Sequence, residues 1–269
     1  YGKDENGNDI YYNKDTYSIT SEDNMKDPWG SDILNRSVNG YVKVGVPLNP
    51  DNSQNIALIA DYSYQDMDSY FGSTRYLAGQ HSAYANLLYQ NVISDSHQFT
   101  LGLNGTFDRY DEDFKRVIWM APVAEKTGIT DLANTGVFGE YTFNSGEKFS
   151  AIAGLRGDWF YKQGFKVSPR VTLKYMPVDE IVIRANGGRG LRYSTPLVDN
   201  IGVFSTGKAF VGSYNDHILE DAWTFGGNLT YYIPVGATSN TYVSFDYFRT
   251  QFAQQMVVDY VATQIDFYA

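Results

Sequence analysis

Apolar and polar side chains alternate along most of this chain. In HQFTLGLNGTFDRY, residues 97–110, the odd positions are mostly apolar and the even positions mostly polar. Successive side chains of a β-strand point to opposite faces, so this two-residue period predicts a strand. The same period returns at 41–48, 56–65, 137–144, 148–159, 167–175, 181–186 and 243–247.

Charged residues within these strands fall on the polar face, except Arg109 and Arg249, which lie at strand ends. Those on the polar face are Lys43, Asp61, Asp108, Glu140, Lys148, Arg156, Asp158, Arg170, Lys174, Arg184 and Asp246. A soluble β-sandwich would aim the apolar face at a buried core, whereas an outer-membrane barrel would aim it at lipid. The alternation alone is compatible with both.

Strand length and connection length favour the barrel. Several strands run to ten or twelve residues, near the roughly 9–11 of a tilted membrane strand and above the soluble mode of about 5–6. Short connections (49–54, 93–96, 145–147, 176–180 and 234–240) alternate with long ones (67–79, 109–133, 160–165 and 191–219). That order places all short turns at one end of a barrel.

Aromatic residues near the strand ends, among them Tyr62, Tyr141, Trp159, Tyr175 and Tyr231, match the girdles at a membrane interface. The predicted fold class is therefore all-β. We expect an antiparallel transmembrane β-barrel segment of about ten to twelve long strands, with short periplasmic turns and long extracellular loops.

Composition removes other classes of protein. The net charge is −10 and the 21 Lys and Arg residues are scattered, which argues against a nucleic-acid partner. Without cysteine there is neither a disulfide framework nor a thiolate metal site. The longest apolar runs, IALIA (56–60) and VIWMAPVA (117–124), are far shorter than the roughly 20 residues of a membrane helix.

Three stretches resemble the barrel of TonB-dependent outer-membrane receptors, most closely those of Bacteroidetes. They are FKVSPRVTLKYMPVDEIVIRANGGRGLRYSTPLVDNIGVFSTGKAF (165–210), LEDAWTFGGNLTYYI (219–233) and VSFDYFRTQFAQQMVVDY (243–260). TGVFGEYTFNSGEKFSAIAGLRGDWF (135–160) fits the same family, and the likeness thins before residue 80. The resemblance implies a barrel of 22 strands, filled by an N-terminal plug that contacts the energy-coupling protein TonB. On this basis we expect residues 1–269 to be part of one barrel domain, with 1–40 an extracellular loop and the plug absent from this segment.

The resemblance also implies a function. We expect a receptor in the cell outer membrane that imports an iron-siderophore, haem or cobalamin by TonB-dependent active transport, with the likeness leaning away from the large glycan importers. Its partners would be the TonB complex through the missing plug, outer-membrane lipid and the small ligand, with no cofactor and no catalysis. Three alternatives stay open: a protease-like outer-membrane barrel, a passive barrel, and a soluble adhesin or carbohydrate-binding β-sandwich.

The protease alternative has one motif in its favour, Asp95-Ser96-His97, together with acidic pairs at 66–68 and 111–113. The alternation of connections puts the first at a short turn and the other two among the long ones. Groups at opposite ends of a barrel cannot share one water, as general acid–base chemistry demands.

The most ligand-like stretch is 191–219, because it mixes charged, aromatic and apolar residues, and loops on a rigid scaffold commonly bind ligands. Its candidate ligand-binding residues are Arg192, Tyr193, Asn200, Lys208, Tyr214 and His217. The alternative is a packed cap over the barrel.

Basic residues of the polar face are the second set of candidates. We expect Lys43, Arg156, Arg170, Lys174 and Arg184 to face the lumen, where they would contact the plug or line the ligand route, or merely keep the lumen wet.

Two further motifs have structural explanations. Gly187, Gly188 and Gly190 would permit strand curvature or close packing. The acidic run 108–114 could offer oxygen ligands to Ca²⁺, but it lacks the spacing of a calcium loop and is better explained as a solvated acidic tip. The three histidines are dispersed, and we expect no metal site.

Overall fold

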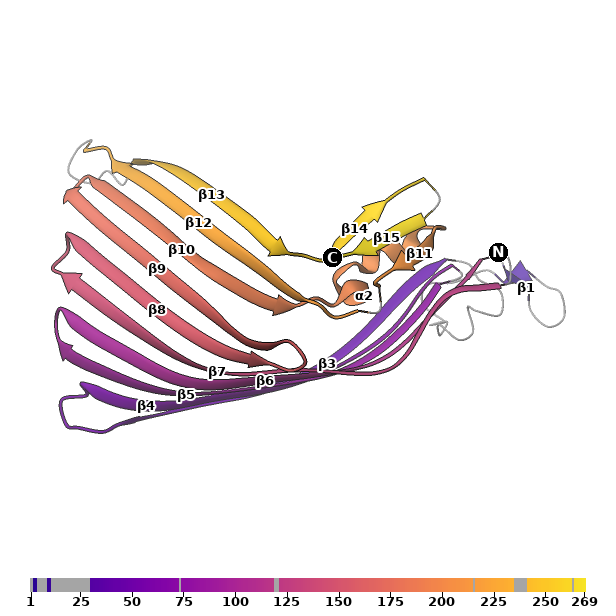
Figure 1. Ribbon diagram of the computed structural model, residues 1–269, viewed down its shortest axis with the longest axis horizontal. Coiled ribbons are helices and arrows are strands. Elements are labelled where there is room, and N and C mark those ends of the chain that lie inside the picture. Colours follow the sequence, from indigo (N-terminus) through magenta and orange to yellow (C-terminus); the bar gives the residue numbers. More distant parts are fainter. Residues whose placement is uncertain are drawn as a thin grey trace.

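A single long sheet dominates the computed structural model, which describes residues 2–3, 9–10, 30–72, 74–118, 121–214, 216–234, 241–262 and 264–269. Ten strands form it, each antiparallel to its neighbours and in sequence order apart from β11 (Figure 1). They are β3 (Ser31–Pro47), β4 (Gln54–Phe71), β5 (Thr74–Ser94), β6 (His97–Ile118), β7 (Ala121–Ser145), β8 (Phe149–Phe160), β9 (Gly164–Val178), β10 (Ile181–Tyr193), β12 (Leu219–Tyr232) and β13 (Tyr242–Gln254). The predicted all-β, antiparallel fold class is confirmed.

Smaller elements lie outside this sheet. Strands β1 (Gly2–Lys3) and β2 (Asp9–Ile10) pair with each other. A three-stranded sheet has the order β11–β15–β14, from β11 (Ala209–Gly212), β14 (Val257–Tyr260) and β15 (Gln264–Tyr268). Two short helices, α2 (Pro196–Asp199) and the 3₁₀ helix η1 (Ile201–Ser205), precede β11. Among the residues described, no helix has the length and hydropathy to cross a bilayer.

The large sheet is one curved layer (Figure 1), and the side chains on its apolar face are exposed. The register aligns Leu58, Leu87, Leu103 and Val137 on four adjacent strands, and their side chains are between 43% and 60% exposed. A β-sandwich would bury these side chains against a second sheet. The sandwich alternative is therefore excluded.

Four strands extend beyond the expected boundaries. Residues 67–79 and 109–133 were predicted as long connections, but they continue the strands: β4 ends only at Phe71 and β5 begins at Thr74, while β6 ends at Ile118 and β7 begins at Ala121. The expected loop over 1–40 is likewise wrong for residues 31–40, which belong to β3. The other residues of that range lie outside the described part of the chain, apart from 2–3, 9–10 and 30.

The apolar side changes faces within these extensions. Near the tight turns, the apolar side chains of β6 lie on the exposed face of the sheet. Farther along β6, Phe114 and Glu112 are buried on the opposite, polar face, whereas Asp111 and Lys115 are exposed on the first face. The alternation typical of a membrane strand therefore disappears at this point, and with it the signal for a strand.

Strands β9 and β10 separate partway along their length. Their paired residues end at Gly188–Arg170, although both strands continue. The next residue on β9 is Pro169, which has no N–H to donate to a ladder. Instead the Arg189 guanidinium crosses the gap, and its Nη1 donates a hydrogen bond to the carbonyl of Val167 at 2.8 Å.

Close packing explains two of the three glycines Gly187, Gly188 and Gly190 of β10. A Cβ on Gly187 would lie 3.1 Å from the Phe225 ring, and one on Gly188 would lie 3.1 Å from the Pro169 carbonyl. Close packing accounts for these two positions. Nothing lies within 4 Å of such an atom at Gly190, so packing does not account for it.

Candidate functional site

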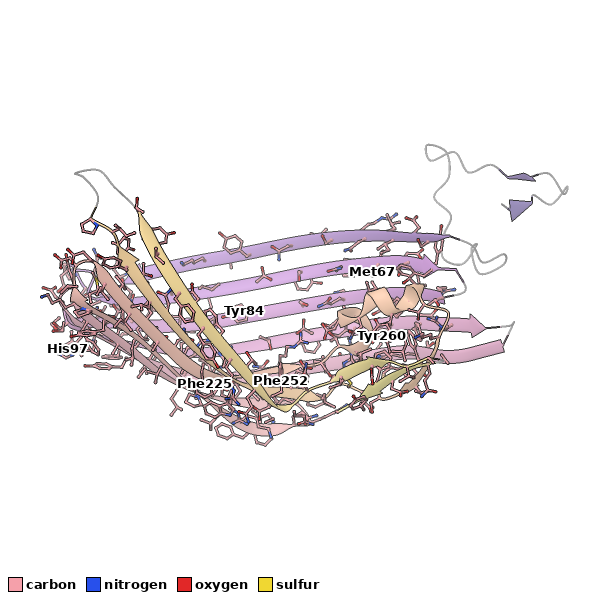
Figure 2. All side chains as sticks on the ribbon, turned by 90° about the horizontal axis from the view of Figure 1, so that it is seen from above. Met67, Tyr84, His97, Phe225, Phe252 and Tyr260 are labelled. Carbon is pink, nitrogen blue, oxygen red and sulfur yellow. The ribbon has the colours of Figure 1, made fainter. Side chains whose placement is uncertain are left out.

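Two segments cover the polar face of the sheet at the end opposite the tight turns. We call residues 194–218 and 255–268 together the cap; they contain α2, η1, β11, β14 and β15. Figure 2 views the molecule from above and labels Met67 of β4 and Tyr260 of β14 at this end. Cap residues and the outer parts of β4 to β6 share one buried cluster: Tyr76, Ala78, Phe114, Leu197, Val203, Phe204, Phe210, Met256, Ile265 and Phe267, with Met67 packed against it.

A cluster of three aromatic rings fastens the cap to the sheet. The centroid of the Phe114 ring of β6 lies 5.4 Å from those of Phe204 and Phe210 of the cap, which are 6.1 Å from each other, so the three rings form a triangle. The Arg116 guanidinium lies against the same cluster, 4.8 Å from the Phe210 centroid. Burial lowers the pKa of Arg116 to about 10, so it keeps its charge at neutral pH and the cation–π contact persists.

A chain of polar contacts forms a second attachment. The Tyr76 hydroxyl donates to Glu112 Oε1 at 2.9 Å, and Lys126 Nζ lies 2.5 Å from Glu112 Oε2. Lys126 Nζ is also 3.1 Å from His217 Nε2, while His217 Nδ1 is 2.9 Å from the Ser194 carbonyl. A carbonyl only accepts, so Nδ1 carries the proton and Nε2 accepts from Lys126. Burial, reinforced by Lys126, lowers the pKa of His217, which keeps the imidazole neutral.

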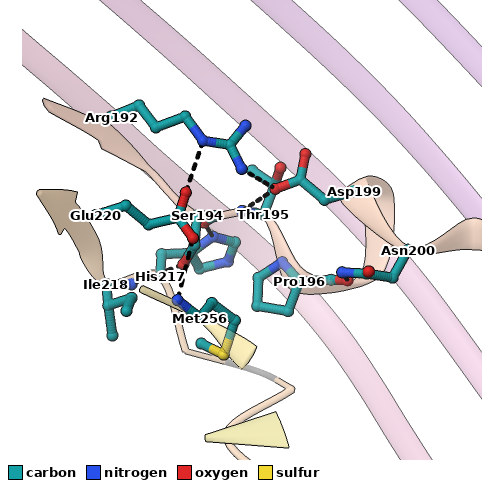
Figure 3. A network of polar contacts seen from close by, with 10 residues as sticks. All are labelled: Arg192, Ser194, Thr195, Pro196, Asp199, Asn200, His217, Ile218, Glu220 and Met256. Atoms are coloured by element: carbon teal, nitrogen blue, oxygen red, sulfur yellow. Dashed lines mark hydrogen bonds and ion pairs between the residues drawn. The ribbon is translucent and has the colours of Figure 1, made fainter. Parts of the chain in front are cut away.

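A third set of contacts joins the two cap segments (Figure 3). Arg192 donates from Nε to Glu220 Oε2 at 2.7 Å and from Nη2 to Asp199 Oδ2 at 3.1 Å. The other oxygen of Glu220 accepts the Met256 N–H at 3.0 Å. One carboxylate thereby holds the start of β12, the end of β10 and the second cap segment together.

Below α2 lies a cavity of about 610 Å³. Its walls come from β6 to β10 and from the first residues of the cap. The lining residues are Thr106, Asp108, Tyr110, Leu132, Asn134, Arg156, Asp158, Phe160, Ser168, Arg189, Gly190, Leu191, Arg192, Tyr193, Thr195, Val198 and Asp199. Aromatic, apolar and charged side chains therefore meet around one space, and polar or charged residues are in the majority.

Charges around the cavity are mostly paired. Arg156 donates from two nitrogens to Asp158, each at 2.6 Å, and Arg189 holds Asp221 at 2.9 and 2.7 Å. Asp108 differs, because its carboxylate accepts a hydrogen bond from Ser82 and no cation of the described residues lies within ion-pair distance of it.

The structure brings two of the six expected ligand-binding residues to this cavity, Arg192 and Tyr193. The other four lie in the cap. Asn200 Nδ2 donates to the Pro196 carbonyl at 2.8 Å and Lys208 Nζ to the Val261 carbonyl at 2.5 Å. Tyr214 packs edge-on against Phe114, Phe210 and Phe267. His217 belongs to the series of polar contacts that runs through Lys126 to Glu112 and Tyr76. This arrangement is that of the packed cap; ligand binding by these residues stays a prediction.

Asp108, Tyr110, Asp158 and Phe160 were not among the expected ligand-binding residues. All four sit on strands, at positions of the polar face, and the expected binding residues were taken from one loop. The sequence signal that could have found them is their position on the polar face of the alternating pattern, close to the strand ends next to the cap.

The five basic candidates for a lumen all occupy the polar face by register. Arg156 is paired with Asp158, and Arg184 donates to Asn228 Oδ1 at 3.0 Å. Within the described ranges, Lys43, Arg170 and Lys174 form no ion pair. That this face borders a lumen stays a prediction.

The acidic run does not form a tip. Asp111 and Asp113 lie on one face of β6, where Asp113 pairs with Arg75 at 2.6 Å, and Glu112 is buried on the other. No group of three or more Asp, Glu, His or Cys residues in the described part is arranged to hold a metal. His81 and His97 contact the hydroxyls of Tyr62 and Tyr141, apart from the cavity.

A second hollow, of about 690 Å³, lies on the apolar face among residues such as Leu87, Leu101, Val137 and Leu155. Nearly all of its lining is hydrocarbon, so it offers no polar group to orient a ligand. We therefore place the candidate site in the cavity below α2.

Comparisons with known proteins point to one family. A family model described as TonB dependent receptor-like, β-barrel, matches residues 1–268. The fold is similar to the ferric yersiniabactin uptake receptor FyuA from Yersinia pestis (14% identity, TM-score 0.56, covering 85% of this chain and 38% of that one). It is also similar to P. aeruginosa FpvA bound to heterologous pyoverdines (10%, 0.54, 84% and 34%) and to the copper transporter OprC (14%, 0.55, 88% and 42%). The chain thus spans between 34% and 42% of these three structures. A comparison with curated protein sequences finds no match.

Proposed function

Because this chain belongs to the family of TonB-dependent receptor-like β-barrels, we propose that it forms part of the wall of an outer-membrane receptor that imports a scarce ligand by TonB-dependent transport. The observation that carries the proposal is the open apolar face of a single-layer sheet. Leu58, Leu87, Leu103 and Val137 are exposed together on it, which is costly in water but favourable against acyl chains.

The height of the apolar band supports this location. On β6 the outward apolar side chains run from Phe99 to Phe107, and the next outward residue, Arg109, pairs with Asp131 at 2.9 Å. Eight steps of about 3.3 Å, tilted by roughly 40°, give a band of about 20 Å, close to the roughly 25 Å of outer-membrane barrels. The polar face then borders a lumen, and Lys43, Arg156, Arg170, Lys174 and Arg184 contact the plug or line the ligand route.

The cavity below α2 supports import of a small ligand from the outer side. Its volume, about 610 Å³, is within the roughly 300–1,000 Å³ of small-molecule sites. Arg192 and Tyr193 contribute to ligand binding there, and Asn200, Lys208, Tyr214 and His217 hold the cap that covers it. The cargo in this proposal is an iron-siderophore, haem or cobalamin; names of similar folds, a ferric yersiniabactin receptor and a copper transporter, favour a metal-bearing one.

TonB is the proposed energy-coupling partner, acting through a plug domain of the full-length protein. The family consists of receptors and transporters, so the proposed activity is transport without catalysis. The Bacteroidetes type stays a prediction.

Uptake in the native host tests the proposal. Labelled ferric siderophores, haem and cobalamin are supplied to wild-type cells, to cells lacking the gene and to cells lacking TonB. We expect one ligand whose accumulation falls in both mutants and returns with the full-length gene. Accumulation that needs the gene but not TonB would instead identify a passive barrel, and loss of none of the three ligands would refute import of this cargo.

A further inference from the structure

We propose that the cavity below α2 binds a cationic group of the ligand, an ammonium or a guanidinium. This inference rests on the proposed function, since it concerns the ligand of the same receptor. Three features of the lining carry it: neutralised arginines, one unpaired carboxylate, and fixed aromatic rings.

The arginines of the lining are already occupied. Arg156 is held by Asp158, Arg189 by Asp221, and Arg192 by both Asp199 and Glu220. Two of these contacts are bidentate, a geometry that matches a carboxylate to a guanidinium on both sides. An anionic ligand would have to displace those carboxylates, which stay nearby and repel it. The lining itself holds three carboxylates and three guanidiniums, but Asp221 and Glu220 neutralise Arg189 and Arg192 from behind the lining, so the charge of Asp108 is left uncompensated.

Asp108 supplies the unpaired charge. The Ser82 hydroxyl donates to its Oδ1, which orients the carboxylate while leaving Oδ2 without an assigned donor in the described part. The residue is half-buried and lines the cavity. Partial loss of water strengthens its attraction for a cation, because fewer solvent dipoles screen the charge.

Aromatic rings complete the environment. Tyr110 follows Asp108 on the polar face, and its hydroxyl accepts a hydrogen bond from Gln80 Nε2 at 3.1 Å. The Tyr193 hydroxyl donates to the Tyr161 carbonyl at 2.7 Å, and its ring meets Phe160 edge-on at 5.6 Å between centroids. These contacts fix the rings before a ligand arrives. Aromatic faces beside a carboxylate are a favourable setting for an organic cation.

Three small phenols that differ only in their end group test the charge preference. Tyramine carries an ammonium, N-acetyltyramine a neutral amide, and 3-(4-hydroxyphenyl)propionate a carboxylate. Dissociation constants are measured by ligand-observed NMR on the purified full-length receptor in detergent. We expect tyramine to bind at least about fivefold tighter than the amide, the effect of one weakly screened ion pair, and the carboxylate to bind least.

Asp108→Asn is the informative variant, because it keeps the shape and an oxygen for Ser82 while removing the charge. The preference for tyramine should disappear in it. Glu140→Gln is the matched control: it removes an acid from the same polar face, at a residue outside this cavity's lining, and should keep the preference. Both variants are checked for the heat-dependent gel mobility of a folded barrel.

The outcomes separate this inference from the proposed function. Equal binding of the three probes, absence of tyramine binding, or an unchanged preference in Asp108→Asn overturns the cationic site. A receptor that prefers tyramine through Asp108, yet supports no TonB-dependent uptake, keeps the site and refutes the importer. TonB-dependent uptake by a receptor that shows no preference for tyramine keeps the importer and refutes the cationic site.

Discussion

Placing a charge on the apolar face is the sharpest test of where that face lies. Leu103 is midway along the apolar band of β6, four residues from both Phe99 and Phe107, and 49% of its surface is exposed. Its lateral neighbours by register, Leu87 and Val137, are also exposed. In water Leu103→Arg would be nearly neutral, because no core contact is lost. At the midplane of a bilayer an arginine on the lipid side of a barrel costs about 2–4 kcal/mol.

The control is Thr100→Arg on the same strand. Thr100 lies on the polar face directly opposite Glu140 of β7, so an arginine there gains a partner and should be tolerated. The full-length protein and both variants are folded into lipid vesicles, and the free energy of unfolding is measured by urea titration. We expect a loss of about 2–4 kcal/mol for Leu103→Arg and less than about 0.5 kcal/mol for Thr100→Arg. Equal stability of the two variants would refute the assignment of the apolar face to lipid.

Three further predictions concern the cap. Phe114→Ala removes the sheet's ring from the cluster with Phe204 and Phe210 and should weaken cap attachment by about 3–5 kcal/mol, seen as faster hydrogen exchange in 194–218; unchanged exchange would show that this cluster does not hold the cap. Because the pKa of His217 is lowered in the closed cap, the cap should be fully stable above the ordinary histidine pKa of about 6.5 and lose stability as pH falls below it. His217→Gln should flatten that exchange profile, and a wild-type profile that does not change between pH 7.5 and 5.5 would contradict it. Tyr193→Phe removes a hydrogen bond to the Tyr161 carbonyl and should cost about 1 kcal/mol in urea unfolding; no change would show that water replaces it.

The sequence predicts the part of the fold near the tight turns well, because there a single rule holds: one face of the sheet is apolar and the other is polar. Beyond Arg109 that rule changes. Asp111, Asp113 and Lys115 face outward while Phe114 faces the cap, so a pattern based on outward apolar residues ends before the strand does. The outer halves of β6 and β7 were missed for this reason.

The candidate site is less visible in the sequence because its residues come from distant segments. Asp108 and Arg192 line one cavity although 84 residues separate them, and only the register and curvature of five strands bring them together. Lys126 of β7 and His217 of the cap are likewise distant in the sequence but in contact in the structure. Local composition identified the loop as unusual, but it cannot distinguish a side chain that holds the loop in place from one that faces a ligand.

The β9–β10 pairing stops next to Pro169, so the end of the large sheet near the cap is divided into two groups of strands, here called panels. One panel ends at β9, and the other begins with β10, which leads directly into the cap. Above Gly188 no backbone hydrogen bond of the ladder joins them; the side chains of Arg189 and Tyr193 bridge the seam instead. The cavity straddles this seam, with Ser168 on one side and Gly190 on the other. Parting the panels would therefore widen the cavity for the cost of a few side-chain contacts, while the backbone pairs from Ile181–Val178 to Gly188–Arg170 stayed intact.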